Sequence, residues 1–136
     1  MNGSEGGTLP PALIVVGDEI DHALIIRRLL ADIAPDLPVE VLSEMRDLVR
    51  RLGEAPRDAL VLMDRLLDGR EVFDAFAALR VARPDLTVVM LSEEERRQAL
   101  ASGADHAAQK PGRIAEWRAL LAELLRLSAQ PGERAA

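Results

Sequence analysis

Residues 12 to 24 read ALIVVGDEIDHAL, and this stretch decides the fold. Its first five residues form a continuous apolar run rich in Val and Ile, which is typical of a β-strand buried on both faces. From Ile20 to Ala34 the apolar residues follow helical spacing. Because only Gly17-Asp18-Glu19 separates the run from the helix, the stretch predicts a strand–helix unit of a parallel sheet.

The same unit occurs five times along the chain. The predicted strands are residues 12–16, 39–42, 59–63, 86–91 and 106–109, and the predicted helices are residues 20–34, 44–52, 72–81, 93–102 and 114–127. Right-handed crossovers leave few arrangements for five such units. We therefore expect an α/β fold of the flavodoxin-like, doubly wound kind, with a five-stranded parallel sheet of order 2-1-3-4-5 and helices on both faces.

The length of 136 residues suits one domain. Residues 12–127 are expected to form it, between a flexible leader at 1–11, rich in Gly and Pro, and a flexible tail at 128–136. Hydrophobic residues make up 49% of the chain and aromatic residues only 2%, so the core is expected to consist of Leu, Val, Ile and Ala.

Composition and charge exclude several classes of function. The chain has no Cys, which excludes thiolate catalysis and Cys-ligated metal centres. His22 and His106 have no partner at ligand spacing and are expected to be surface or loop histidines. A net charge of −6 argues against direct binding to nucleic acid or an anionic membrane. No apolar run approaches the roughly 18 residues of a membrane span, and the N-terminus lacks a basic signal segment. We therefore expect a cytoplasmic protein.

Polar side chains follow the predicted strands at their carboxyl ends. Asp18-Glu19 follows the first strand, Asp64 the third, Ser92 the fourth and Lys110, the only Lys of the chain, the fifth. In a doubly wound sheet these ends share the edge where ligands bind. Taken singly, each residue has a structural explanation: a helix cap, a turn residue or a solvated charge. Their coincidence at four strand ends favours a site.

The chemistry of these groups suits phosphoryl transfer. One carboxylate can act as the nucleophile and become an acyl phosphate, and a second can hold Mg²⁺. A Lys ammonium neutralises the charge that develops, and a hydroxyl donates a hydrogen bond to a phosphoryl oxygen. A donor that arrives already phosphorylated requires no general base.

The motifs at the strand ends resemble those of the receiver domain of bacterial two-component response regulators, the CheY-like family, over residues 12–127. They are VVGDE, LVLMD, VVMLS, and ALASGAD followed by QKP. The resemblance implies that Asp64 is the phosphoacceptor and that Mg²⁺ is held by Asp18, Asp64 and the backbone carbonyl of Leu66. It further implies that Ser92 takes the place of the switch hydroxyl and that Lys110 is the family lysine.

The sequence departs from the family at several positions, so an atypical receiver is expected. Gly17 stands where the family has an acid, Leu67-Asp68 where it has Met-Pro, and Val72 where it has Gly. Ala107 replaces the aromatic switch residue, and Gly112 replaces a common Phe. The first change removes one carboxylate from the metal site, and Ala107 removes the aromatic group of the conformational relay. The family also implies a cis bond before Pro111, in a rigid turn that aims the lysine.

The leading interpretation is a regulatory domain rather than an enzyme. It is phosphorylated on Asp64 by a sensor histidine kinase or phosphotransfer protein with Mg²⁺. It signals by associating with a downstream target protein, because the predicted tails are too short for a DNA-binding effector. The alternative is a phosphorylation-independent pseudo-receiver that acts as a protein-binding module, as Gly17 and Ala107 suggest. A third reading is a small flavodoxin-like enzyme or nucleotide binder, which the absence of a D-x-D motif at Asp64 weakens.

The last predicted helix carries apolar residues over an arc of roughly 160°, wider than the roughly 100° that a core-facing stripe needs. We expect Ile114, Leu121 and Leu125 to pack on the sheet. Leu120 and Leu127 are expected at a partly exposed margin. That margin either borders a homodimer or partner surface, formed with strand 5, or belongs to a generously covered core.

Overall fold

A five-stranded parallel sheet of order β2-β1-β3-β6-β7 forms the centre of the molecule, which confirms the predicted fold class. The computed structural model describes residues 9–91 and 96–128, although nothing is described of the Arg96 side chain. The sheet strands are β1 (Leu13–Val16), β2 (Val39–Leu42), β3 (Leu60–Asp64), β6 (Thr87–Leu91) and β7 (His106–Ala108). The predicted Ser92 and most of the predicted leader and tail lie outside the described residues.

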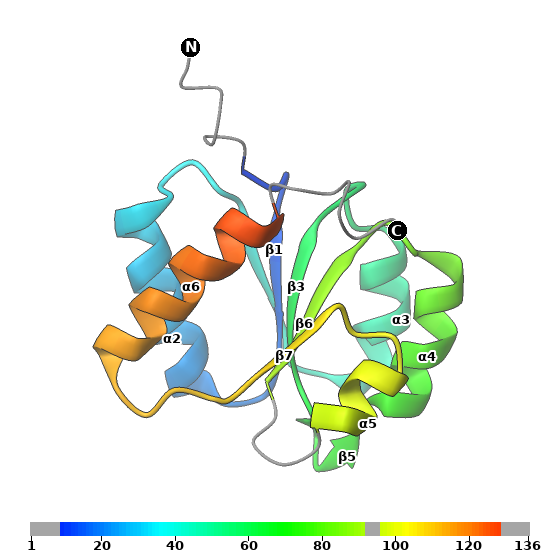
Figure 1. Ribbon diagram of the computed structural model, residues 1–136. Coiled ribbons are helices and arrows are strands. Elements are labelled where there is room, and N and C mark those ends of the chain that lie inside the picture. The colour runs from blue at the N-terminus through cyan, green and yellow to red at the C-terminus, as the bar shows by residue number, and fades with distance from the viewer. Residues whose placement is uncertain (1–8, 92–95, 129–136) are drawn as a thin grey trace.

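Helices cover both faces of the sheet (Figure 1). Their bounds are α2 (Ile20–Ile33), α3 (Met45–Gly53), α4 (Phe73–Ala82), α5 (Arg96–Ala101) and α6 (Ile114–Ser128). Helices α2 and α6 pack together on one face, and α3, α4 and α5 lie on the other. None of the described helices has both the length and the apolar character needed to span a membrane.

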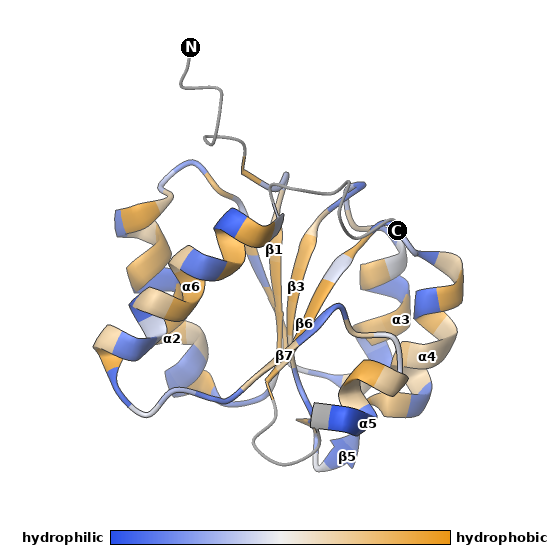
Figure 2. Cartoon of the chain, in the orientation of Figure 1, coloured by the Kyte–Doolittle hydropathy of each residue, from blue (hydrophilic) through white to orange (hydrophobic). Residues whose placement is uncertain are grey.

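The core has two halves, one on each face of the sheet, because alternate strand residues point in opposite directions. In β1, Ile14 and Val16 join the half beneath α3 and α4, whereas Leu13 and Val15 join the half beneath α2 and α6. Every residue of β1, β3 and β6 is buried, as continuous apolar runs predict. Figure 2 shows the apolar strands in the centre. Aliphatic residues dominate, and the scarce aromatic residues are buried with them.

A small hairpin between β3 and α4 was not predicted. Its strands are β4 (Leu66–Leu67) and β5 (Arg70–Glu71), which pair antiparallel. The two residues between them, Asp68 and Gly69, have φ angles of 57° and 73°. Two successive positive φ angles are the geometry of a type I′ turn, which favours Asp-Gly. The hairpin lies at the carboxyl edge of the sheet, next to the predicted site (Figure 1).

The prediction for α6 is wrong at one position. Leu121 and Leu125 are buried as expected, and Leu120 and Leu127 lie partly buried at the margin of the core. Ile114, however, is 62% exposed. It is the first residue of α6, and helical side chains lean toward the N-terminus. Its side chain therefore points past the end of the helix.

Candidate functional site

The carboxyl edge of the sheet brings Asp64 and Lys110 together. Asp64 is the last residue of β3, and Lys110 follows β7 on the other side of β6. The Lys110 ammonium Nζ lies 3.1 Å from Oδ1 of Asp64, whose side chain is only 12% exposed. The strand-end rule therefore places a buried carboxylate and a cation in direct contact.

Burial and charge act in opposite directions on Asp64. Burial raises the pKa of its carboxyl group, while the positive charge of Lys110 lowers it, and burial outweighs the charge. The resulting pKa lies above the usual value for an aspartate, so the anion at this position is less stable than in water. The site thus combines a buried carboxylate with a lysine ammonium in contact with it.

Glu19 is a second partner of Lys110. Lys110 Nζ donates a hydrogen bond of 2.7 Å to Oε1 of Glu19, which directly precedes α2. Partial burial by itself lowers the pKa of Lys110, but the bond to Glu19 and the charge of Asp64 outweigh it and raise that pKa. The same bond lowers the pKa of Glu19. Lys110 is thus shared between two carboxylates.

Gly17 makes close contact with Asp64. A Cβ atom added at Gly17 would lie 2.6 Å from Oδ2 of Asp64, closer than non-bonded atoms approach. The carboxylate therefore occupies the space into which a side chain at position 17 would start. Asp64 thus packs over the bare backbone of Gly17.

Asp18 points toward the hairpin. Its Oδ2 accepts a hydrogen bond of 2.9 Å from the Asp68 backbone N–H. Asp68 in turn accepts a bond of 3.0 Å from the backbone N–H of Met45 and so caps the start of α3. Asp18 is not the N-cap of α2, since that position is Glu19 and makes no side-chain cap bond.

Three further predictions concern Leu66, Ser92 and Pro111. Leu66 lies in β4 at the site edge, with an exposed side chain. Ser92 lies outside the described residues, and nothing is said of its position. The prediction of a cis peptide bond before Pro111 is wrong, because that bond is trans. The trans isomer is the lower in energy for X–Pro bonds, so a turn after β7 does not require cis.

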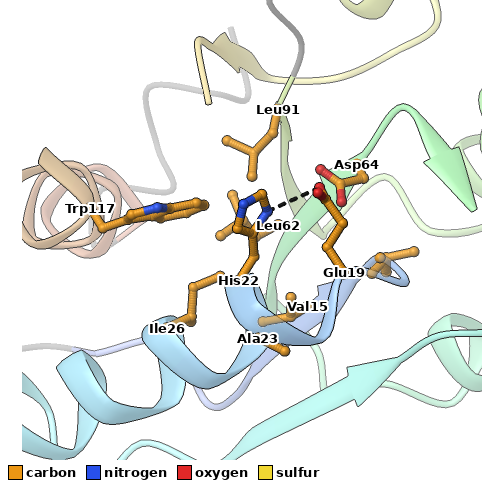
Figure 3. Close-up of a pocket in the computed structure, with 11 residues that line it drawn as sticks. Val15, Glu19, His22, Ala23, Ile26, Leu62, Asp64, Leu91 and Trp117 are labelled. Atoms are coloured by element: carbon orange, nitrogen blue, oxygen red, sulfur yellow. Dashed lines mark ion pairs between the residues drawn. The ribbon is translucent and has the colours of Figure 1, made fainter. Parts of the chain in front are cut away.

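His22 belongs to the site, although it was expected to be a plain surface or loop histidine. Its Nδ1 lies 3.0 Å from Oε1 of Glu19, the same oxygen that Lys110 binds. Its ring packs against that of Trp117 in α6, with 5.4 Å between ring centres. Figure 3 shows His22 between Trp117 and Glu19 in a pocket that Asp64 also lines. The spacing of Glu19 and His22, one helical turn apart, was the available sequence signal.

Comparisons with known proteins show that solved structures share this architecture. No protein-family model and no curated protein matches the sequence. A response regulator receiver domain from Rhodospirillum rubrum superposes with a TM-score of 0.70 at 16% identity, covering 87% of this chain and 93% of that one. The chemotaxis response regulator CheY4 of Vibrio cholerae superposes with a TM-score of 0.69 at 21% identity, covering 87% of this chain and all of that one.

The chain has the receiver-domain fold. The receiver domain of a Pseudomonas aeruginosa sensor histidine kinase also superposes, with a TM-score of 0.66 at 20% identity, covering 85% of this chain and 98% of that one. It is described with a magnesium ion coordinated in its active-site cleft. In the receiver fold of this chain, Asp64 and Lys110 lie at the carboxyl edge of the sheet.

The side chains of this receiver fold do not form a ready site for magnesium. Among the described residues, no three His, Cys, Asp or Glu side chains are grouped as a metal would require. Gly17 offers no carboxylate, Asp18 accepts the Asp68 N–H through one of its two oxygens, and Oδ1 of Asp64 lies 3.1 Å from the Lys110 ammonium. Magnesium prefers octahedral oxygen ligands in near-ideal geometry, and the charge beside Asp64 is instead an ammonium.

Proposed function

We propose that this chain is a regulatory receiver, not an enzyme with a substrate of its own. It accepts a phosphoryl group on Asp64 from a histidine kinase or phosphotransfer protein and signals by associating with a downstream target protein. One observation carries the proposal: a buried, destabilised carboxylate at the end of β3, with the Lys110 ammonium 3.1 Å away. The receiver fold of the solved structures supports it.

The chemistry needs few groups. An Asp64 carboxylate oxygen attacks the phosphorus of a phosphohistidine, a P–O bond forms, and the P–N bond breaks with its electron pair on the departing imidazole. Because the carboxylate must be ionised to attack, the charge of Lys110 supports the reactive form against the effect of burial. Lys110 also lies where it neutralises negative charge on the transferred phosphoryl group.

Magnesium at Asp18, Asp64 and the Leu66 carbonyl stays a prediction. Asp18 accepts the Asp68 N–H through Oδ2, which leaves Oδ1 available as a ligand. The structure gives geometry for the Asp64 carboxylate and the Lys110 ammonium, and the proposal rests on these two groups. Phosphorylation that requires magnesium supports the predicted ligand set, and phosphorylation that is equally fast with a chelator overturns it.

The second candidate function is a protein-binding module that acts without phosphate. The close packing of Asp64 over Gly17 favours it, because a phosphoryl group on Oδ2 would have to displace that contact. Under both functions the partner is a protein, and the net charge of −6 is why no direct contact with nucleic acid is proposed. We keep the homodimer through β7 and α6 as a proposal, with Leu120 and Leu127 at its border.

Acetyl phosphate, a small phosphoryl donor, distinguishes the two functions. Wild type should gain the mass of one phosphoryl group, and Asp64→Asn should gain none. Asp74→Asn is the matched control, because it alters an exposed carboxylate in the first turn of α4. The receiver function is supported if wild type and Asp74→Asn are labelled and Asp64→Asn is not. A wild type that stays unlabelled, or an Asp64 variant labelled equally well, overturns it.

A further inference from the structure

A chain of contacts leads from Asp64 to the α2–α6 layer. Lys110 contacts Asp64 on one side and Oε1 of Glu19 on the other, at 3.1 and 2.7 Å. The same Oε1 lies 3.0 Å from Nδ1 of His22, and the His22 ring packs against Trp117 (Figure 3). We call Glu19, His22 and Trp117 the side path. It connects the end of β3 with two helices far apart in sequence.

The two ends of this path differ in how firmly they are held. Trp117 is 2% exposed in the core between α6 and the sheet. Glu19 is 49% exposed, and an ion pair open to solvent contributes little to stability. The Glu19–Lys110 pair is therefore easily exchanged, whereas a change beside Trp117 must be accommodated by the packing of α2 on α6.

On the β7 side of the site, one of the described residues has a very small side chain. Position 107, in the middle of β7, is an alanine, so its side chain is a single methyl group. A methyl group has no rotamers with which to report a change at Asp64. Among residues 9–91 and 96–128, the long, polar and aromatic side chains connected to Lys110 lie toward α2 and α6.

We propose that the charge at Asp64 is transmitted along the side path to the packing of α2 against α6. The inference rests on the proposed function, since phosphorylation supplies the change in charge. A phosphoryl group carries more negative charge than the carboxylate and adds acceptor oxygens, so Lys110 leaves Glu19 for the phosphoryl group. Glu19 then retains His22 as its partner, and the His22 ring shifts against Trp117.

Trp117 is the only tryptophan of the chain, so its fluorescence reads the end of the path directly. Acetyl phosphate is added to the full chain, and intact mass and Trp117 emission are measured on the same sample. In wild type the emission should change in proportion to the labelled fraction. His22→Phe keeps a ring against Trp117 but lacks Nδ1, so it should lose more than half of the emission change per labelled molecule. Glu19→Gln should also lose most of the change per labelled molecule.

Asp21→Asn is the matched control, because it removes an exposed carboxylate from the same turn of α2. It should behave as wild type. Labelling on Asp64 with unchanged Trp117 emission, or with an equal change in His22→Phe, overturns the side path and leaves the proposed function standing.

A second comparison needs no phosphoryl group. Asp64→Asn removes the charge that holds Lys110 on one side, so its Trp117 emission should differ from that of wild type without any donor. The difference should disappear when both proteins carry His22→Phe. Identical spectra in the first pair overturn the side path, whereas failed labelling in the donor experiment overturns the proposed function, so the two failures are distinguishable.

Discussion

Gly17→Ala tests the contact that most distinguishes this site. The new Cβ would start 2.6 Å from Oδ2 of Asp64, so the buried carboxylate must move by several tenths of an ångström. Gly17 does not have a left-handed φ, and an alanine there meets no backbone strain. The cost of the substitution therefore comes from the Asp64 side chain alone.

The magnitude follows from two opposing effects. Overpacking a buried position costs about 1–3 kcal/mol, whereas replacing Gly by Ala restricts the unfolded chain and stabilises the fold by about 0.4–1 kcal/mol. We expect a net loss of about 1–2 kcal/mol in the free energy of unfolding. At a urea dependence of about 1–3 kcal/mol per molar, the midpoint should fall by on the order of 1 M.

A double-mutant cycle in urea unfolding isolates the contact. In an Asp64→Ala background the carboxylate is gone, so Gly17→Ala should stabilise by about 0.5 kcal/mol, the entropic gain alone. Gly53→Ala is the matched control, since its Cβ would meet no atom within 4 Å. The reasoning is refuted if Gly17→Ala has the same sign and size in both backgrounds.

Three further outcomes are expected. Because burial raises the pKa of Asp64, its contribution to stability is greatest below the unfolded pKa and is lost as pH rises through the folded one. Asp64→Asn should therefore be more stable than wild type at about pH 7, with the difference vanishing below about pH 4 in urea melts; a difference independent of pH would contradict this. Asp85→Ala leaves the part-buried Arg83 guanidinium without its carboxylate partner, 2.9 Å away, and should cost about 2 kcal/mol in the same assay; a loss below about 0.5 kcal/mol would show that the pair behaves as a surface pair. Leu120→Glu combined with Leu127→Glu should weaken self-association in sedimentation with little loss of melting temperature, and a large melting shift at unchanged mass would instead assign both leucines to the core.

The five-stranded sheet was predictable because its buried strands have a local signal. A parallel strand buried on both faces reads as a continuous apolar run, and such runs at β1, β3 and β6 are unambiguous. The β4–β5 hairpin escaped prediction because two-residue strands show no alternation. Its Asp68-Gly69 turn was the one available signal, and it was interpreted only as a departure from a family motif.

The site was predictable as far as strand ends determine it. The rule that carboxyl ends share one edge is enough to bring Asp64 and Lys110 together. That rule does not predict the direction in which each side chain points. Asp18 turns to the hairpin, which was not foreseen, and His22 meets Trp117 only because α2 packs on α6.

Gly17 shows why the two levels must be read together. In the sequence it is a missing acid, and the missing acid predicts a weaker metal site and nothing more. In the structure the same glycine is the surface on which the Asp64 carboxylate lies, within reach of Lys110. An acid placed at position 17 would add a carboxylate and at the same time displace the Asp64 carboxylate beside it. Positions 17 and 64 are therefore coupled, because a side chain at position 17 would displace the Asp64 carboxylate from its present orientation.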